Sequence, residues 1–375
     1  MKIPVAKPYL TKEEAQNAYD TILTNWVTQG PRVQEFEEKF AKYTGSKYAV
    51  ALSNCTNALH LAMIVAGIKE GDEVICPSMS YIATANSITY VGAKPVFAEV
   101  HSDTFNLDVN HTEKLITSKT KAILLVHQIG LPADIDAFKN LCKKNNLILI
   151  EDAACAVGSA YKGKKIGSHS DLVCFSFHPR KVITTGDGGM ITTNNQQYYN
   201  RLRLLRQHGM SINDRERHNS DKIIFEEHLE IGYNYRLTDI QAAVGIKQLE
   251  KLDWIIEERR KIASKYQQAF KNIKCVRLPT EPEGYFTNWQ SYVLYLKPES
   301  KVKRNELIQL LLNKGISSRR GVMTSHREKA YGDYKLSLPV SEDASDNSIV
   351  LPLYVPMSDV EIDYVIKAVS SILIP

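Results

Sequence analysis

Short apolar segments alternate with helix-like segments through the first half of the chain, and this order limits the folds that it can adopt. The apolar segments are rich in β-branched residues and carry few polar interruptions, which is typical of parallel strands covered on both faces. The predicted strands are Tyr48–Leu52, Glu73–Cys76, Pro95–Glu99, Ala122–Val126, Leu147–Ile150, Leu172–Phe177 and Gly189–Thr192. We therefore predict an α/β fold with a mostly parallel central sheet.

Helix start and stop signals lie between and beyond these strands. Thr11–Glu14 has the pattern of a capping box, and a second one at Thr238–Gln241 opens a long amphipathic helix that we expect to continue to about Phe270. Other predicted helices are Ala15–Leu23, Val33–Tyr43, Ala58–Ala66, Asp134–Asn145, Arg304–Lys314 and Ser358–Leu373, and Trp289–Leu296 alternates like a half-buried strand. We expect a large domain at residues 1–250 and a small C-terminal domain at 251–375.

Composition disfavours several classes of protein. The six cysteines form no Cys-x-x-Cys pair, which argues against a zinc site and a disulfide scaffold. No run approaches the roughly 20 apolar residues of a membrane span, and the first residues lack a signal-peptide core. The net charge of +5 is spread along the chain and forms no basic tail, so it gives no support for a nucleic-acid surface and could equally favour anionic small molecules. We expect a cytoplasmic enzyme without a metal, membrane or nucleic-acid partner.

Asp152 and Lys181 are the first candidates for chemistry. Asp152 follows a buried strand, and ligands of doubly wound sheets bind at the carboxyl ends of strands. Lys181 lies in the polar, glycine-containing loop of Ser176–Gly189. A lysine amine becomes a Schiff-base nucleophile when its site lowers its pKa, and a carboxylate can keep a pyridine ring protonated. Taken alone, Asp152 is more simply a helix N-cap and Lys181 a solvated surface charge.

A possible phosphate site follows the first predicted strand. Ser53–Thr56 leaves that strand and opens a helix, so backbone N–H groups and the helix dipole meet there. The hydroxyls of Ser53 and Thr56 would add hydrogen-bond donors. Taken alone, this motif is more simply an ordinary capped helix start.

These three motifs make the chain resemble the DegT/StrS-type sugar aminotransferases, a branch of the fold-type I pyridoxal-phosphate enzymes. The matching stretches are Trp26–Pro31, Ser53–Leu61, Pro77–Asn86, Glu151–Ala154, Ser176–Gly189 and Gly232–Asp239, in the family's order. The resemblance implies a mostly parallel central sheet sandwiched by helices, a smaller C-terminal α+β domain, and pyridoxal 5'-phosphate as cofactor. It also implies a homodimer with shared active sites.

The resemblance assigns roles around the cofactor ring. Lys181 would bind the cofactor as a Schiff base and move protons, Asp152 would face the pyridine nitrogen, and Tyr81 would stack on the ring. Core packing is the simpler role for Tyr81. Where relatives commonly carry His or Gln near the cofactor's phenolic oxygen, this chain has Cys155, whose thiol is a weak hydrogen-bonding substitute.

The phosphate contacts are implied in the same way. Cys55, mainly through its backbone, Thr56 and Ser176 would hold the cofactor's phosphate. Asn234 would reach the phosphate in the neighbouring subunit, although a turn residue in Gly-Tyr-Asn-Tyr is the simpler explanation.

For the substrates, the resemblance implies L-glutamate as donor and a nucleoside-diphosphate keto sugar, often a 4-keto-6-deoxy hexose, as acceptor. Thr28 and Gly30 would lie beside the sugar, and Arg236, Arg319 and Arg320 would suit its diphosphate. A solvated strand edge is an equal explanation for Arg319 and Arg320.

Two other functions stay open. The acceptor could instead be a cyclitol or a small keto phosphate, and the protein could be a non-catalytic, cofactor-bound regulator. Lys181 argues against the family branch in which histidine replaces this lysine. Gln128 and Ile129 depart from the aromatic and polar residues frequent at their turn and could indicate an unusual acceptor.

Overall fold

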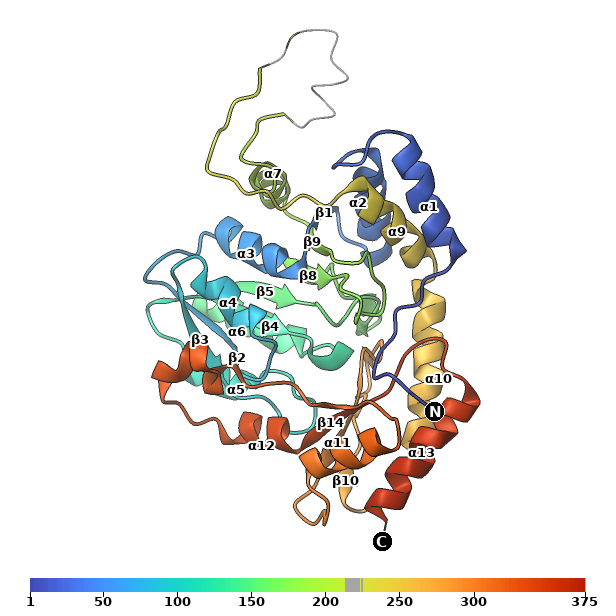
Figure 1. The fold of residues 1–375 in the computed structure, drawn as a ribbon. Helices are drawn as coiled ribbons and strands as arrows, with labels where there is room; N and C mark the ends of the chain where they lie inside the picture. Colours follow the sequence, from blue (N-terminus) through green and yellow to red (C-terminus); the bar gives the residue numbers. More distant parts are fainter. Residues whose placement is uncertain (213–222, 224, 375) are drawn as a thin grey trace.

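A computed structural model of the chain describes residues 1–212, 223 and 225–374. Its main strands are β1 Tyr48–Leu52, β2 Glu73–Pro77, β3 Lys94–Ala98, β4 Thr120–Val126, β5 Ile148–Asp152, β8 Val173–Ser176 and β9 Gly189–Thr193. They form one seven-stranded sheet in the order β1-β9-β8-β5-β4-β2-β3 (Figure 1). β9 runs antiparallel to both β1 and β8, and the other neighbours are parallel. The predicted mostly parallel sheet is confirmed.

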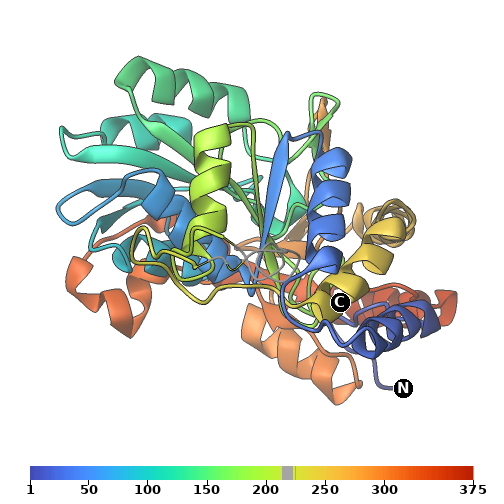
Figure 2. The same cartoon turned by 90° about the horizontal axis from the view of Figure 1, so that it is seen from above.

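Alternating side chains of the sheet contribute to two hydrophobic cores. On β1, Val50 and Leu52 join one core, whereas Ala49 and Ala51 join the other. The first core is covered by α3 Cys55–Val65, α4 Ala83–Thr89 and α7 Gln196–Leu205. The second is covered by α2 Pro31–Thr44, α6 Ile135–Asn145, α9 Asp239–Glu250 and α10 Leu252–Phe270. Helices therefore lie on both faces of the sheet (Figure 2).

The C-terminal part builds its own antiparallel sheet. Its strands are β10 Val276–Arg277, β12 Tyr292–Leu296, β13 Arg319–Arg320 and β14 Ser348–Leu351, in the order β10-β12-β14-β13. A smaller sheet has the order β11-β6-β7, in which β6 Ala160–Tyr161 lies between β11 Tyr285–Phe286 and β7 Lys164–Lys165. The other helices among the described residues are α1 Lys12–Leu23, α5 Val109–Lys114, α11 Arg304–Asn313, α12 Pro339–Asn347, α13 Asp359–Leu373 and the 3₁₀ turns Gln128–Gly130, Ser325–Arg327 and Lys329–Tyr334. In the described ranges, no helix is long and apolar enough to cross a membrane.

Two predicted elements are wrong in extent. The single helix expected from Thr238 to Phe270 is interrupted at Lys251, whose N–H bonds Gln248 O in a tighter turn. The strand expected from Trp289 begins only at Tyr292, because Trp289 has a left-handed backbone (φ 49°) that a strand cannot contain. The proposed domain boundary near residue 250 stays a prediction, and Ile3 also pairs with Ile316 of the C-terminal part.

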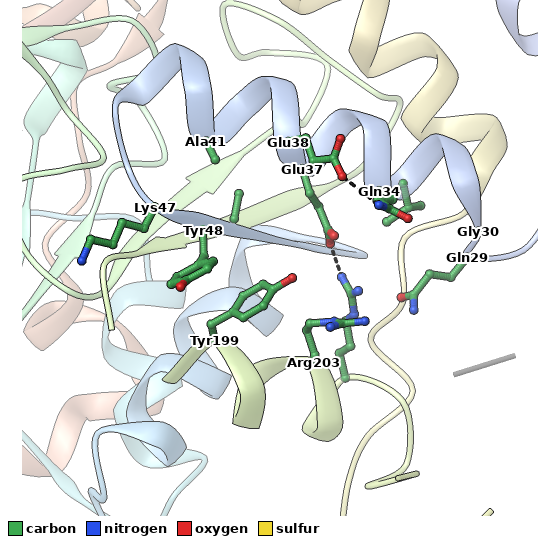
Figure 3. A pocket seen from close by; sticks show the side chains of 13 residues that line it. Gln29, Gly30, Gln34, Glu37, Glu38, Ala41, Lys47, Tyr48, Tyr199 and Arg203 are labelled. Atoms are coloured by element: carbon green, nitrogen blue, oxygen red, sulfur yellow. Dashed lines mark hydrogen bonds and ion pairs between the residues drawn. The ribbon is translucent and has the colours of Figure 1, made fainter. Parts of the chain in front are cut away.

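A buried ion pair covers the outer edge of β1. Glu37 of α2 accepts a 2.8 Å hydrogen bond from Ala51 N, and Arg206 Nη1 donates to Ala51 O at 2.9 Å and to Glu37. Both charged side chains are almost fully buried. A groove of about 670 Å³ lies between α2, β1 and α7, with Gln29 and Gly30 at one end (Figure 3). The residues that line this groove include neither of the two catalytic candidates.

We predict that Arg206→Leu lowers the free energy of unfolding by about 3–5 kcal/mol, because it leaves the buried Glu37 charge unpaired. Arg203→Leu, which loses a cation–π contact with Tyr199, should cost about 1 kcal/mol or less. The double variant that combines Arg206→Leu with Glu37→Leu should lose less stability than Arg206→Leu alone. Denaturant unfolding followed by circular dichroism measures all three, and equal losses for the two arginine variants would contradict the prediction.

Candidate active site

The sheet register brings the predicted site residues to one edge. Leu52, Gly189 and Ser176 are paired across β1, β9 and β8. Because β9 is antiparallel, its first residue lies at the edge where β1 and β8 end. Asp152 ends β5 at the same edge and pairs with Cys174. The loop of residues 177–188, which contains Lys181, therefore starts and finishes at this edge.

The helix start after β1 is built to meet a phosphate. Asn54 caps α3 by accepting a 2.8 Å bond from Asn57 N, and the Asn57 amide donates to Ser53 Oγ at 2.8 Å. Gly189 permits this turn to pack against β9, since a Cβ there would lie 2.5 Å from the Asn54 carbonyl. The positive end of the α3 dipole thus lies at the sheet edge.

Two of the three hydroxyls predicted at the phosphate lie on α3 and β8. Thr56 is half-buried in the first turn of α3, and Ser176 is buried at the end of β8. Cys55 begins the helix, with its side chain buried in the core, so a contact from Cys55 to a ligand would use its backbone N–H. The arrangement fits the phosphate group of the implied cofactor.

The buried carboxylate of Asp152 accepts hydrogen bonds from two donors. Its Oδ1 accepts from Ala154 N at 3.1 Å, and its Oδ2 accepts from Thr84 Oγ1 at 2.8 Å. The residues after Asp152 form turns, so the simpler explanation as a helix N-cap is wrong. A buried anion at a strand end fits a protonated ring nitrogen.

The Lys181 amine is directed into the protein and not to bulk solvent. Its Nζ lies 3.2 Å from Cys155 Sγ, and its backbone N–H bonds His178 O, so the explanation as a solvated surface charge is wrong. Burial lowers the pKa of this amine, but Cys155, Cys55 and Asp152 outweigh burial and raise that pKa above its ordinary value. The direction is opposite to the one expected from the sequence. A cation paired with Asp152 would weaken the shift, because it would neutralise the carboxylate.

Tyr81 follows the turn at the end of β2. Its ring is 71% exposed, so core packing is not its role. The turn is held by the C-terminal part: Ser78 Oγ lies 2.5 Å from His326 Nδ1, and Met79 pairs with Thr324. His326 was not predicted, because an isolated histidine in the sequence gives no signal of its partner.

A loop of the C-terminal part also supports both ends of the Lys181–Cys155 contact. Asn288 Nδ2 donates to Cys155 O at 2.9 Å, and Gln290 Nε2 donates to Arg180 O at 2.6 Å. Arg259 on α10 holds this loop through the Trp289 and Gln290 carbonyls. These residues could not be predicted from the sequence, because the left-handed backbone at Trp289 that shapes the loop has no recognisable pattern there.

The loop that contains Thr28 and Gly30, which are predicted to lie beside the sugar, is held in place by Asp239. Its carboxylate accepts hydrogen bonds from Gly30 N at 2.8 Å and Val33 N at 3.0 Å, and its own N–H donates to Thr28 O. Thr28 remains exposed. The contact explains why the Gly232–Asp239 motif and the N-terminal loop belong together.

The predicted arginines lie on two different segments of the chain. Arg319 and Arg320 form β13 at the edge of the small sheet, as the equal alternative of a solvated strand edge predicted. Burial, and then the charges of Arg180 and Arg320, lower the pKa of Arg319, which places Arg180 in the same basic cluster. Arg236 instead donates to Asn234 Oδ1 at 3.2 Å. Arg180 was missed because only the fold brings the two loops together.

The Gln128–Ile129 departure forms a buried turn. Gln128 Nε2 donates to the Met79 carbonyl, and Ile129 adopts a left-handed backbone with φ 62°. Beside it, His127 Nε2 lies 2.8 Å from Glu151 Oε2, and His127 Nδ1 accepts from Ala133 N. The accepting Nδ1 means that His127 is neutral and donates through Nε2. This turn therefore supports the strand ends behind the Tyr81 turn.

A model of the DegT/DnrJ/EryC1/StrS aminotransferase family matches residues 8–370. The chain belongs to this family. This aminotransferase is 37% identical over 376 residues to the spore coat polysaccharide biosynthesis protein SpsC of Bacillus subtilis, covering 99% of the chain and 97% of SpsC. The resemblance to the family is confirmed.

Solved structures agree with the fold. The putative sugar aminotransferase Spr1654 from Streptococcus pneumoniae, in its PMP-form, superposes with a TM-score of 0.94 at 29% identity over 99% of both chains. Helicobacter pylori PseC, an aminotransferase involved in the biosynthesis of pseudoaminic acid, gives 0.93 at 28% identity over 100% of this chain and 99% of PseC. The fold-type I class is confirmed, while the roles of individual site residues remain predictions.

We predict that Cys155→Ala lowers the pKa of the Lys181 amine, because the sulfur that accepts from its ammonium form is lost. When the reaction of the apoprotein with pyridoxal phosphate is measured as a function of pH, the midpoint of the curve should therefore shift to lower pH. Cys275→Ala, at a distant half-buried thiol, is the matched control and should leave it unchanged. A midpoint in Cys155→Ala that is unchanged or raised would disprove the contact's effect.

Proposed function

We propose that this pyridoxal-phosphate-dependent sugar aminotransferase moves the amino group of L-glutamate to a keto sugar carried by a nucleoside diphosphate. One observation carries the proposal. A lysine amine, a buried carboxylate and a hydroxyl-flanked helix start converge at a single sheet edge. This arrangement matches the three parts of the cofactor, namely its aldehyde, ring nitrogen and phosphate.

The bound cofactor supplies an electron sink for negative charge that develops next to the transferred nitrogen. Asp152 would hold the proton on the ring nitrogen, because a buried carboxylate favours a cation beside it. Tyr81, whose ring is exposed, would lie against the ring face. Thr56, Ser176 and the Cys55 backbone N–H would hold the phosphate.

Lys181 would perform both anchoring and proton transfer. Its Nζ would hold the cofactor until the donor amine displaces it. The freed Lys181 amine would then take the proton from the donor's α-carbon and deliver it to the cofactor side of the transferred nitrogen. The same steps in reverse order with the keto sugar would complete a ping-pong cycle. Asn288 and Gln290 keep the backbone on either side of this amine in place.

The acceptor is inferred from charge and from relatives. SpsC is a polysaccharide biosynthesis protein, and PseC serves pseudoaminic acid biosynthesis, so keto sugars bound to nucleotides, such as a 4-keto-6-deoxy hexose, are the favoured class. Arg319, Arg320 and Arg180 form a basic cluster that suits a diphosphate. Thr28 and Gly30 would lie near the sugar, and Arg236 would contribute where the subunits meet.

A homodimer with shared sites is part of the proposal. Four apolar side chains in the segment before Asn234 are strongly exposed, namely Ile223 at 86%, Phe225 at 84%, Leu229 at 61% and Ile231 at 89%. Exposed apolar groups of this size favour burial against another protein surface. A second copy of the chain would cover them and bring Asn234 to the partner's phosphate site.

We predict that the purified enzyme, supplied with L-glutamate, aminates a nucleoside-diphosphate keto hexose, as mass spectrometry of the product would show. Lys181→Ala should reduce turnover by roughly a hundredfold or more, because no other amine takes its protons. The panel includes a keto cyclitol and a small keto phosphate. Turnover of one of these alone would overturn the nucleotide-sugar assignment, and a spectral response to glutamate without any product would favour the regulator.

We predict that mixing inactive Lys181→Ala and Asn234→Ala chains restores about a quarter of wild-type activity, since half of the dimers would carry one intact site. Refolding or co-expression of the two variants provides the mixed dimers. Each variant refolded alone is the control and should stay inactive. If mixing restores nothing although mixed dimers form, each site is built within one chain.

A further inference from the structure

Two buried hydroxyls stand behind Asp152, on the side of α4. Thr84 Oγ1 lies 2.8 Å from Asp152 Oδ2, and Ser80 Oγ lies 2.7 Å from Thr84 Oγ1. Thr84 is 1% exposed, Ser80 is 3% exposed and Asp152 is 5% exposed. The three groups therefore form a chain shielded from water, which runs from the Tyr81 turn to the end of β5.

Each of the two hydroxyls has a single proton, and this fixes the direction of the hydrogen bonds between Ser80, Thr84 and Asp152. An ionised carboxylate only accepts hydrogen bonds, so the Thr84 hydroxyl donates its single proton to Asp152. Thr84 can then only accept from Ser80, whose hydroxyl must be the donor between the two. Both hydroxyl dipoles thus point their positive ends toward the carboxylate, and each link strengthens the next.

We propose that Thr84, supported by Ser80, is a positioning residue that fixes the orientation of the Asp152 carboxylate and directs its free lone pairs toward the cofactor's ring nitrogen. The inference rests on the proposed function, because it assigns that partner to Asp152. Ala154 N occupies the other oxygen at 3.1 Å, so the two donors together fix the plane of the carboxylate. A neutral or rotated Asp152 would hold the ring proton less firmly.

Other titratable groups near Asp152 must be considered in any pH experiment. Lys181 lies on the loop after β8, Cys55 begins α3, and Cys174 lies on β8. Burial first, and then the charge of Asp152, raise the pKa of both Cys55 and Cys174 well above the ordinary value, so these thiols stay neutral near pH 7. Lys181 and the buried Glu151, which precedes Asp152 on β5 and pairs with His127, are charged neighbours, and all are unchanged in the variants below.

The test compares Thr84→Val, which removes the hydroxyl at nearly constant shape, with Thr84→Ser, which keeps it. Thr84→Val should weaken binding of pyridoxal phosphate to the apoprotein by roughly tenfold to a hundredfold, the loss expected for a charge-assisted hydrogen bond. It should also lower the pH at which the absorption of the bound cofactor changes with loss of the ring proton. Thr84→Ser should restore both values to near wild type, and Ser80→Ala should show a smaller shift in the same direction.

Ser87→Ala is the matched control. Its buried hydroxyl is also on α4 but bonds the Thr84 carbonyl, so this variant should leave affinity and absorption unchanged. Equal effects of Ser87→Ala and Thr84→Val, or no rescue by Thr84→Ser, would overturn the inference in favour of a packing role. Asp152→Asn tests the role of Asp152 separately from the role of Thr84. If it changes the absorption while Thr84→Val does not, only this inference fails; if Asp152→Asn also has no effect, the role proposed for Asp152 fails.

Discussion

The site depends on one topological constraint, which is that β9 runs against both of its neighbours. A parallel connection would carry the chain away from the carboxyl edge through a crossover helix. The antiparallel return instead keeps residues 177–188 at that edge, where β5 and β1 also end. Lys181, Asp152 and the start of α3 come together because the chain turns back there, and Gly189 allows the returning strand to contact the α3 turn.

The sequence predicted what depends on local pattern. Apolar runs located the strands, and the position of Asp152 after one of them made it a candidate, although a helix N-cap was the simpler explanation until the family motifs were considered. Lys181 was different, because nothing local distinguishes it from other loop lysines, and the family motifs supplied its role. The direction of β9 could not be read, since an apolar strand buried on both faces looks the same in either orientation.

Contacts between distant segments account for what was missed. Asn288, Gln290 and His326 all come from the C-terminal part, yet they hold the turns that carry Cys155, Lys181 and Tyr81. Their residue types are ordinary for loops, and their value comes only from where the fold puts them. Arg180 joins Arg319 for the same reason. The active site is therefore a joint product of both parts of the chain, which links its geometry to their relative position.

The ion pair over β1 has a consequence for the behaviour of the protein at high concentration. An open edge strand is a template on which other chains can add strands, the first step of edge-to-edge aggregation. Here the outward N–H and C=O of Ala51 are already bonded to Glu37 and Arg206. The pair is itself buried, so a docking strand would have to displace two opposite charges from each other at this point. At Ala51 the edge of the main sheet therefore offers neither backbone group to an added strand.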